Sequence, residues 1–479
     1  MPRKVPRWLW VAPVAAYVLY FQGLSTAGLM GPDEPRYAAI ARAMARTGDW
    51  VTPRLWGLPW FEKSPLLYWM SAVGFRLGWG PELAVRLPVA LLAVAFLALY
   101  WWILNREFGC LAASMATWIL GTCAAWVGFG YAGVTDLPLA ATFSAGMLLA
   151  LPWIGRGDRR WLPLTAALLG VAMLGKYAVA AVLAAPLGIR WRSLGDLLRP
   201  RVVGLFALVA LPWYVACFAY NGMAFVKVAW EHQFGRFATS ALGHPQPWWY
   251  YLPVLAGLLL PWTPLAGLLA GRSGWGDRRR VFLLVWAGFG LLFFSLSVNK
   301  LPGYLLPLCP PLAALMGIRL AETQRVRGWL VACALLLVVL PLAVPLIPAA
   351  LAEGLRRAPH PAFHWSWLLP LAVALPVWFL APRRRLAATA IVALGATAGA
   401  VYVKWADLPQ ADRLASARPV WRAIEGHPGE VCVDHLKNDF VYGLGYYAGQ
   451  PLPACSTSPR PVRVVETPGQ PPRVEGLAP

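Results

Sequence analysis

The chain has little charge. Only 13% of its 479 residues are Asp, Glu, Lys or Arg, while 59% are hydrophobic and the mean hydropathy is +0.56. Long uncharged runs recur from one end to the other. This composition excludes an ordinary soluble protein and predicts a polytopic membrane protein.

Acidic residues are scarce as well. There are 21 of them against 42 Lys and Arg, which gives a formal net charge of +21. Nucleic-acid binding could explain such a balance. Here, however, the basic residues lie in short loops between apolar runs, as expected for cytoplasmic loops of a membrane protein. We therefore expect no nucleic-acid partner. The chain also lacks internal repeats and a compact metal-ligand motif.

The apolar runs predict about thirteen transmembrane helices. Two of them are short spans within residues 161–189 that meet at Lys176. The first span follows Arg3, Lys4 and Arg7 and lacks a convincing cleavage site, so we expect a retained anchor. Besides the two short spans within 161–189, the predicted spans, beginning with this first one, are 8–30, 82–104, 111–130, 136–154, 202–220, 248–270, 279–298, 302–319, 327–350, 366–381 and 386–404.

The basic residues also predict the orientation. With a cytoplasmic N-terminus, alternate loops carry most of the arginines and fall on the cytoplasmic side. These are Arg106, Arg156, Arg159, Arg160, Arg190, Arg192, Arg199, Arg201, Arg272, Arg278, Arg279, Arg280, Arg319, Arg325, Arg327, Arg383, Arg384 and Arg385. The remaining loops and the C-terminal tail then face the outside, in the inner membrane of a cell.

The first outer loop, residues 31–81, is unusually polar. Pro35 and Gly48 mark the two ends of a helix of about twelve residues. A second helix is expected from Ser64 and Pro65 to about Gly78. Both should lie in the membrane interface.

Charged residues stand near the starts of these two helices. Glu62 and Lys63 precede the second one, where free backbone N–H groups and an ammonium favour a phosphate. Alternatively, Asp33 caps the first helix and Glu62 with Lys63 forms a solvated pair. Two later residues have similar alternatives: Asp136 could be functional or a helix cap, and Lys176 could contact phosphate or extend to the interface.

An ordered series of motifs resembles a known family. The series resembles the aminoarabinose transferase and protein mannosyltransferase group of GT-C glycosyltransferases over residues 25–310. It consists of GPDEPRYAAIARAM, TGDWVTPRLWGLPWFEKSPLLYW, AVRLP, TDLP at 135–138, GK at 175–176, His244 before PWWYYLP, and KLPGYLLP at 300–307.

The resemblance implies a GT-C type fold that is all-α and polytopic, with a small α/β segment at its C-terminal end. It implies an enzyme that moves a hexose or pentose from a polyprenyl-phosphate donor to a glycolipid or protein acceptor on the extracytoplasmic face. The accepting group would be the phosphate of a lipid A-type glycolipid or a hydroxyl. Asp33 and Asp136 then correspond to the catalytic aspartates. The donor phosphate would be held by Arg36, Lys63, Tyr304, Lys300 and Lys176, with Glu34 and Trp60 as further site residues.

The expected chemistry needs cations more than a general acid, because a polyprenyl phosphate is a good leaving group. Arg36 can hold phosphate in a planar fork, and Lys63 supplies a point charge. If the acceptor is a hydroxyl, Asp33 is the expected base. If the acceptor is a phosphate, no base is required, and Asp33 would orient or organise the site instead. A direct displacement should invert the anomeric centre.

A divalent metal cation is a conceivable cofactor. Glu62 and His244 are the candidate ligands that the resemblance indicates. Without that resemblance, His244 would be an ordinary interfacial histidine.

Ser64 replaces a proline common in relatives, and we expect it to cap the second helix. Trp60 replaces a common tyrosine and lacks its hydroxyl.

The expected organisation is a catalytic membrane domain at 1–404, an outer lobe at 405–455 and a disordered tail at 456–479. On an oxidising face, Cys432 and Cys455 of the outer segment could form a disulfide.

The alternative function is a transporter or flippase for polyprenyl lipid or solute. Transporters usually place their charges near the midplane and show paired repeats, whereas here the unusual polar residues fall on one face, so the transferase is favoured.

Overall fold

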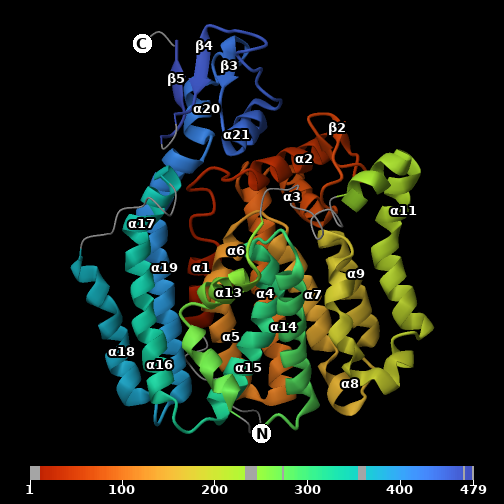
Figure 1. Ribbon diagram of the computed structural model, residues 1–479, viewed down its shortest axis with the longest axis vertical. Coiled ribbons are helices and arrows are strands. Elements are labelled where there is room, and N and C mark those ends of the chain that lie inside the picture. The colour runs from red at the N-terminus through yellow and green to blue at the C-terminus, as the bar shows by residue number, and fades with distance from the viewer. Residues whose placement is uncertain (1–10, 232–244, 272–273, 354–362, 468–469, 477–479) are drawn as a thin grey trace.

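The structure is a helical bundle with a small lobe at one end (Figure 1). This computed structural model describes residues 11–231, 245–271, 274–353, 363–467 and 470–476. Helix α7 (Asp136–Leu149) lies at the centre of the bundle and is almost entirely buried. It packs against α4 (Leu83–Phe108), α9 (Leu162–Lys176) and the 3₁₀ segment η6 (Pro302–Leu308).

Seven described helices or helix combinations are long and apolar enough to cross a membrane, or up to nine if each bent pair is counted as one span. The chain is therefore a multi-pass membrane protein, but the number of thirteen is not confirmed. Several predicted spans correspond to helices of 10–17 residues, such as α1 (Val11–Tyr20), or to pairs bent by 55° and 112°. Apolar runs alone do not reveal such bends.

The remaining elements of the bundle follow in chain order. They are α5 (Cys110–Thr122), α6 (Ala124–Tyr131), α8 (Leu151–Arg156), α10 (Val179–Leu183), η2 (Ala185–Asp196), α11 (Pro200–Trp230), η4 (Trp248–Tyr250), α13 (Tyr251–Leu258), η5 (Thr263–Ala270), α14 (Arg278–Leu296), α15 (Cys309–Glu322), α16 (Arg327–Leu335), η7 (Leu336–Val338), α17 (Val339–Glu353), η8 (Trp365–Leu368), α18 (Leu369–Leu380) and α19 (Arg385–Ala415).

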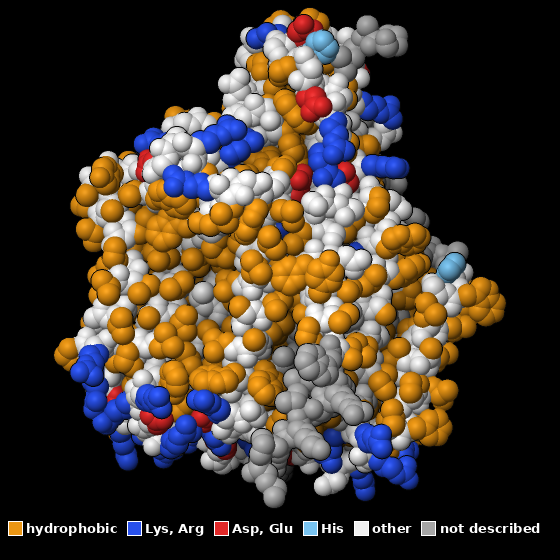
Figure 2. All heavy atoms as spheres, turned by 180° about the vertical axis from the view of Figure 1, so that it is seen from behind, with side chains coloured by type: hydrophobic (Ala, Val, Ile, Leu, Met, Phe, Trp, Pro, Cys, Tyr) orange, Lys and Arg blue, Asp and Glu red, His pale blue; other side chains and the backbone are white. Residues whose placement is uncertain are grey.

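The basic loops meet at one end of the bundle. Glu107 lies 2.9 Å from Arg156 and 3.2 Å from Arg279, so loops far apart in sequence share one carboxylate. Arg159 pairs with Asp196 at 2.8 Å. Figure 2 shows a wide hydrophobic band between Lys and Arg side chains at this end and a second group beneath the lobe. The predicted grouping is thus confirmed for these described basic loops, whereas Arg272 lies outside the described residues.

The first outer loop lies at the opposite end and has the two expected helices. Helix α2 (Asp33–Thr47) begins two residues before Pro35 and ends at Gly48, whose φ of 75° closes the last turn in the left-handed region. The short strands β1 (Arg54–Leu55) and β2 (Leu58–Pro59) then form a hairpin. Helix α3 (Leu66–Arg76) follows.

The chain breaks at Lys176, as predicted. Helix α9 ends there, and Tyr177 adopts a positive φ of 51°. The returning segment, however, consists of a five-residue helix and 3₁₀ turns, α10 and η2, instead of a second regular span.

The lobe has its own small core. A three-stranded sheet in the order β3 (Val431–Asp434), β4 (Val462–Val465) and β5 (Arg473–Glu475) packs with α20 (Arg418–Ile424) and α21 (Asn438–Ala448). The 3₁₀ turn η9 (Pro428–Glu430) leads into β3. Strands β3 and β4 are parallel, whereas β4 and β5 are antiparallel. The expected small α/β segment is present.

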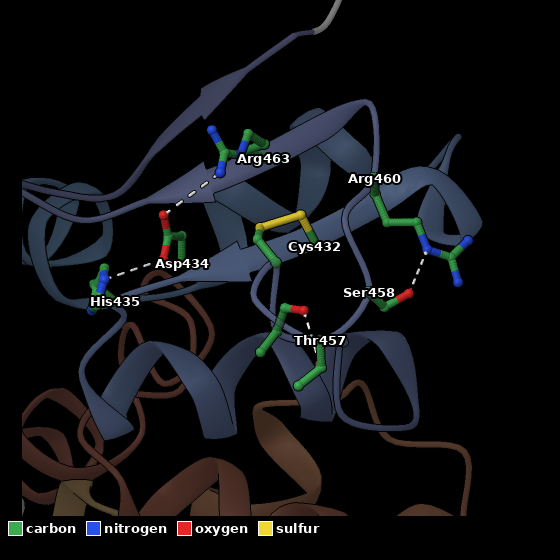
Figure 3. Close-up of a disulfide and its surroundings, with 9 residues drawn as sticks. Cys432, Asp434, His435, Thr457, Ser458, Arg460 and Arg463 are labelled. Atoms are coloured by element: carbon green, nitrogen blue, oxygen red, sulfur yellow. Dashed lines mark hydrogen bonds and ion pairs between the residues drawn. A yellow bond between two sulfur atoms is a disulfide. The ribbon is translucent and has the colours of Figure 1, made fainter.

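The lobe confirms one expectation about the C-terminal segment and contradicts another. Cys432 and Cys455 form a disulfide (Figure 3), which confirms that prediction. The prediction of a disordered 456–479 tail is wrong, because β4 and β5 fall within it and Val462 and Val464 enter the lobe core. The boundary at 404 also falls inside α19, which continues to Ala415.

Candidate active site

Arg36 lies at the centre of a cluster at the end of the bundle opposite the basic loops, which we call the outer end after its predicted orientation. On α2, it pairs with Asp33 one turn earlier, and its Nη1 lies 3.3 Å from Glu62 Oε2. Burial alone would lower the pKa of the guanidinium, but the nearby carboxylates of Glu62 and Asp33 hold that pKa above its ordinary value. Arg36 therefore stays cationic in a largely buried position.

Aromatic rings surround the same guanidinium. Its central carbon lies 5.5 Å from the ring centres of Tyr37 and Trp60 and 5.2 Å from that of Tyr442. Aromatic faces attract cations, most strongly where water is displaced. Trp60 thus contributes its ring, and its indole nitrogen is buried without a hydrogen-bond partner among the described residues. We call Arg36 and these three rings the Arg36 cage.

Glu62 joins the two cations of the first loop. Its Oε1 accepts a hydrogen bond of 2.6 Å from Lys63 Nζ, while Oε2 faces Arg36. Both Glu62 and Lys63 are buried, at 6% exposure each. The alternative of a solvated surface pair is therefore wrong. A buried carboxylate between two cations keeps them together at one place.

A second cluster comes from three distant segments. Lys176 Nζ, at the end of α9, lies 2.7 Å from Asp136 Oδ1, at the start of α7. The same ammonium lies 5.0 Å from the ring centre of Tyr304 in η6. Gly303 permits this approach, because a Cβ atom there would lie 2.4 Å from Asp136 Oδ1. The N-cap position of α7 is Thr135 and Asp136 is the first helical residue, so the cap alternative is wrong.

Tyr177 connects the two clusters. It directly follows Lys176, and its hydroxyl donates a hydrogen bond of 2.6 Å to the carbonyl of Phe61, next to Glu62. Its backbone N–H donates to Ser64 Oγ at 3.0 Å. The expectation that Ser64 caps α3 is therefore wrong. Its hydroxyl instead fastens the Glu62–Lys63 segment to the end of α9.

Glu34 has a different place from its neighbour Asp33. Its carboxylate is buried and paired with Arg86, with contacts of 3.0 and 2.6 Å. It also accepts hydrogen bonds from the backbone N–H groups of Met30 and Gly133. Burial alone would raise the pKa of Glu34, but these partners hold it below its ordinary value. Glu34 therefore holds Arg86 and the backbone of Met30 and Gly133 together beside the cluster, and its predicted place among the site residues stays a prediction.

Two further candidates are placed only in part. Lys300 is buried, and its ammonium donates to the carbonyls of Ser297 and Gln246, the latter at 3.1 Å. The second candidate, His244, lies outside the described residues. The roles predicted for these and the other site residues stay predictions.

Glu62, one of the two predicted metal ligands, is engaged by cations. Both oxygens of Glu62 face cations, Lys63 and Arg36. Among the residues that the structure describes, no group of three or more His, Cys, Asp or Glu side chains could hold a metal ion. A cation at Glu62 and His244 thus stays a prediction.

Sequence reasoning missed three contributors to the site. Tyr442 comes from the C-terminal lobe, whose helix α21 packs on α2. Arg86 lies in the motif AVRLP, whose arginine could have been matched with a buried acid. Tyr177 follows the recognised Gly175–Lys176 motif, but nothing local indicated its bonds to Phe61 and Ser64.

The comparisons with known proteins agree with the sequence motifs. The dolichyl-phosphate-mannose-protein mannosyltransferase family matches residues 62–222. An undecaprenyl phosphate-alpha-4-amino-4-deoxy-L-arabinose arabinosyl transferase of Pseudomonas fluorescens Pf-5 is 33% identical over 65% of this chain and 56% of its own length. One of Pseudomonas aeruginosa PAO1 is 34% identical over 66% of this chain and 61% of its own length.

These matches have a limited extent. The chain spans less than two thirds of the length of the curated relatives that it matches. The solved structure of ArnT from Cupriavidus metallidurans bound to undecaprenyl phosphate has a TM-score of 0.77, covering 96% of this chain and 93% of that one at 24% identity. The fold is therefore that of ArnT, and the resemblance to the GT-C group is confirmed. The transporter alternative has no support from these comparisons.

Proposed function

We propose that the protein is an integral membrane glycosyltransferase that moves a sugar from a polyprenyl-phosphate donor to an acceptor at the outer face of the inner membrane. The N-terminus would be cytoplasmic and the site extracytoplasmic. The observation that carries this proposal is the pairing of the Arg36–Glu62–Lys63 and Asp136–Lys176 clusters at one end of the bundle. Relatives named for undecaprenyl-phosphate sugars support the choice of donor.

The donor phosphate would bind between the cations of the two clusters. Arg36 offers a planar fork and Lys63 and Lys176 offer point charges. All three side chains are largely buried, so their attraction to the departing phosphate is screened little by water. Tyr177 fixes the position of the two clusters relative to each other through its hydrogen bonds to Phe61 and Ser64.

Asp33 is the proposed catalytic carboxylate. Its side chain is 46% exposed, whereas that of its partner Arg36 is only 13% exposed, so Asp33 can meet an incoming acceptor. With a hydroxyl acceptor it would take the proton as the sugar bond forms. With a phosphate acceptor it would orient Arg36. A single displacement inverts the anomeric centre in either case, and Asp136 would keep Lys176 in place.

A comparison of lipid A tests this proposal. Lipid A is compared by mass spectrometry between a strain that makes an undecaprenyl-linked aminoarabinose and the same strain without the intact gene. We expect the added sugar mass only with the gene. An unchanged spectrum would contradict lipid A as the acceptor. Chelation with EDTA followed by addition of divalent cations tests the metal, because a loss that only the cation restores indicates a metal-dependent step.

A further inference from the structure

A basic groove lies beside the Arg36 cage. It has a volume of about 460 Å³ and runs between α2, the β1–β2 turn and the end of α21 in the lobe. These three elements lie side by side at the outer end of the molecule (Figure 1). The groove is lined by Ala39, Arg42, Ala43, Arg46, Thr47, Trp56, Gly57, Gly449, Gln450 and Pro451.

The two arginines give the groove its charge. Arg42 and Arg46 are one turn apart on α2 and so face the same side. Neither has an ion pair with a carboxylate among the residues that the structure describes. Arg42 is held in place by its donation to the carbonyl of Tyr446 and by the Tyr446 ring, whose centre is 4.3 Å away. Two cations without an acidic partner favour an anion.

The other lining residues suit a sugar. Trp56 offers an aromatic surface, while Thr47 and Gln450 offer polar groups in the lining of the groove. The indole nitrogen of Trp56 is buried without a hydrogen-bond partner in the described part of the chain. Binding sites for small molecules commonly combine such an apolar wall with a few polar groups.

The groove and the Arg36 cage share a wall. Trp56 stacks on Tyr442 with ring centres 5.7 Å apart, and Tyr442 in turn lies on Arg36. Gly445 allows this packing, because a Cβ atom there would lie 2.6 Å from the Trp56 ring. Arg42 follows Arg36 by six residues, roughly 9 Å along the helix axis. A saccharide headgroup in the groove would thus reach the reacting centre.

We propose that this groove binds the phosphorylated saccharide headgroup of the acceptor lipid, with Arg42 and Arg46 on its phosphate and Trp56 against its sugar. The assignment rests on the proposed function and adds an acceptor subsite to it. The lobe then contributes to acceptor binding through Gln450 and through the Tyr446 carbonyl that holds Arg42.

Two variants test the groove. Arg46→Gln removes one charge, and Arg42→Lys keeps the charge but loses the planar fork. At saturating donor we expect each to raise the KM for the acceptor about tenfold, the equivalent of one charge-assisted hydrogen bond. The kcat should stay within about twofold, because the chemistry is elsewhere. The control is Arg422→Gln, an exposed arginine of α20.

Direct binding separates this proposal from the proposed transferase activity. The probe is a deacylated, phosphorylated glucosamine disaccharide, titrated against the full chain in detergent. We expect tighter binding to the wild type than to Arg46→Gln, even in the absence of turnover. If the wild type and both groove variants had equal acceptor KM values and equal probe binding, the proposal that the groove binds the acceptor would be overturned. An equal loss in Arg422→Gln would also overturn it, because nonspecific surface charge would then explain the effect.

Discussion

The two ends of the bundle use ion pairs in different ways. At the basic end, Arg156 and Arg159 pair with carboxylates but keep 55% and 51% of their side chains exposed. At the outer end, the side chains of Arg36, Lys63 and Lys176 are only 13%, 8% and 12% exposed. Exposed pairs contribute little to stability. Buried charges cost desolvation and are kept where their position matters.

This difference separates orientation from chemistry. Arginines in the basic loops need only their charge to favour one side of a membrane. The outer cations need a fixed geometry as well, which carboxylates, aromatic rings and the bonds of Tyr177 provide. Substitutions at the outer end should therefore have large and specific effects, whereas equivalent changes at the basic end should have small ones.

The largest effect is expected for Asp33→Asn. The substitution keeps the shape of the side chain but removes its charge and its ability to accept a proton. With a hydroxyl acceptor we expect transfer to fall at least about a hundredfold, the lower range for a lost general base, while the protein still inserts. With a phosphate acceptor we expect a loss because Arg36 is no longer oriented by its ion pair with Asp33. Initial rates in membranes measure this. Arg156→Gln, at the basic end, is the matched control and should keep near-normal transfer. Retained turnover in Asp33→Asn would rule out Asp33 as an essential group.

Glu34→Gln should act on stability. The change leaves Arg86 buried at 1% exposure without its anionic partner. Breaking a buried pair typically costs about 3–5 kcal/mol, so we expect a clear drop in the thermal midpoint of the purified protein. Glu430→Gln, an exposed position in the lobe, provides the control. An unchanged midpoint in Glu34→Gln would show that the buried pair does not stabilise the outer end.

The disulfide should stabilise the lobe to a smaller degree. Cys432 and Cys455 are separated by 23 positions, and closing a loop of that size is worth about 3 kcal/mol in the chain-entropy model. We expect Cys432→Ser to increase proteolysis of the lobe while the membrane helices stay protected. Mass spectrometry of non-reduced peptides gives the direct check. Two free thiols in the wild type would contradict the bond.

Tyr442→Ala should have the smallest of these effects. It removes one ring of the Arg36 cage, and a cation–π contact is worth about 0.5–2 kcal/mol. We expect a rise of about two- to tenfold in the donor KM, with near-normal values in Tyr442→Phe because the ring remains. Tyr402→Ala, on α19 away from the cage, is the control. If Tyr442→Phe lost as much as Tyr442→Ala, the hydroxyl instead of the ring would be responsible.

The local structure of the outer loop could be predicted from the sequence. Pro35, Gly48 and the Ser64–Pro65 pair mark the helices α2 and α3 because their effects on the backbone are local. The break at Lys176 followed from one charge in an apolar stretch. The motifs of the resemblance then supplied the candidate cations.

Contacts across long sequence separations could not be predicted in the same way. Asp33 and Glu34 are neighbours with equal charge, and only the fold places one in a partly exposed position and the other beside Arg86. Tyr442 reaches Arg36 from more than four hundred positions away. Strands β4 and β5 are short and lie among prolines and charges, so their composition resembled that of a disordered tail.

Transfer of sugar from a polyprenyl phosphate by the outer cluster can be measured directly. The most direct test reconstitutes the purified protein in vesicles with undecaprenyl-phosphate aminoarabinose, radiolabelled in the sugar, and a phosphorylated glycolipid acceptor. We expect the label to move to the acceptor with inverted anomeric configuration, and we expect Arg36→Gln to abolish the transfer while Arg156→Gln does not. Equal transfer by wild type and Arg36→Gln, or none by the wild type, would contradict the proposed transfer.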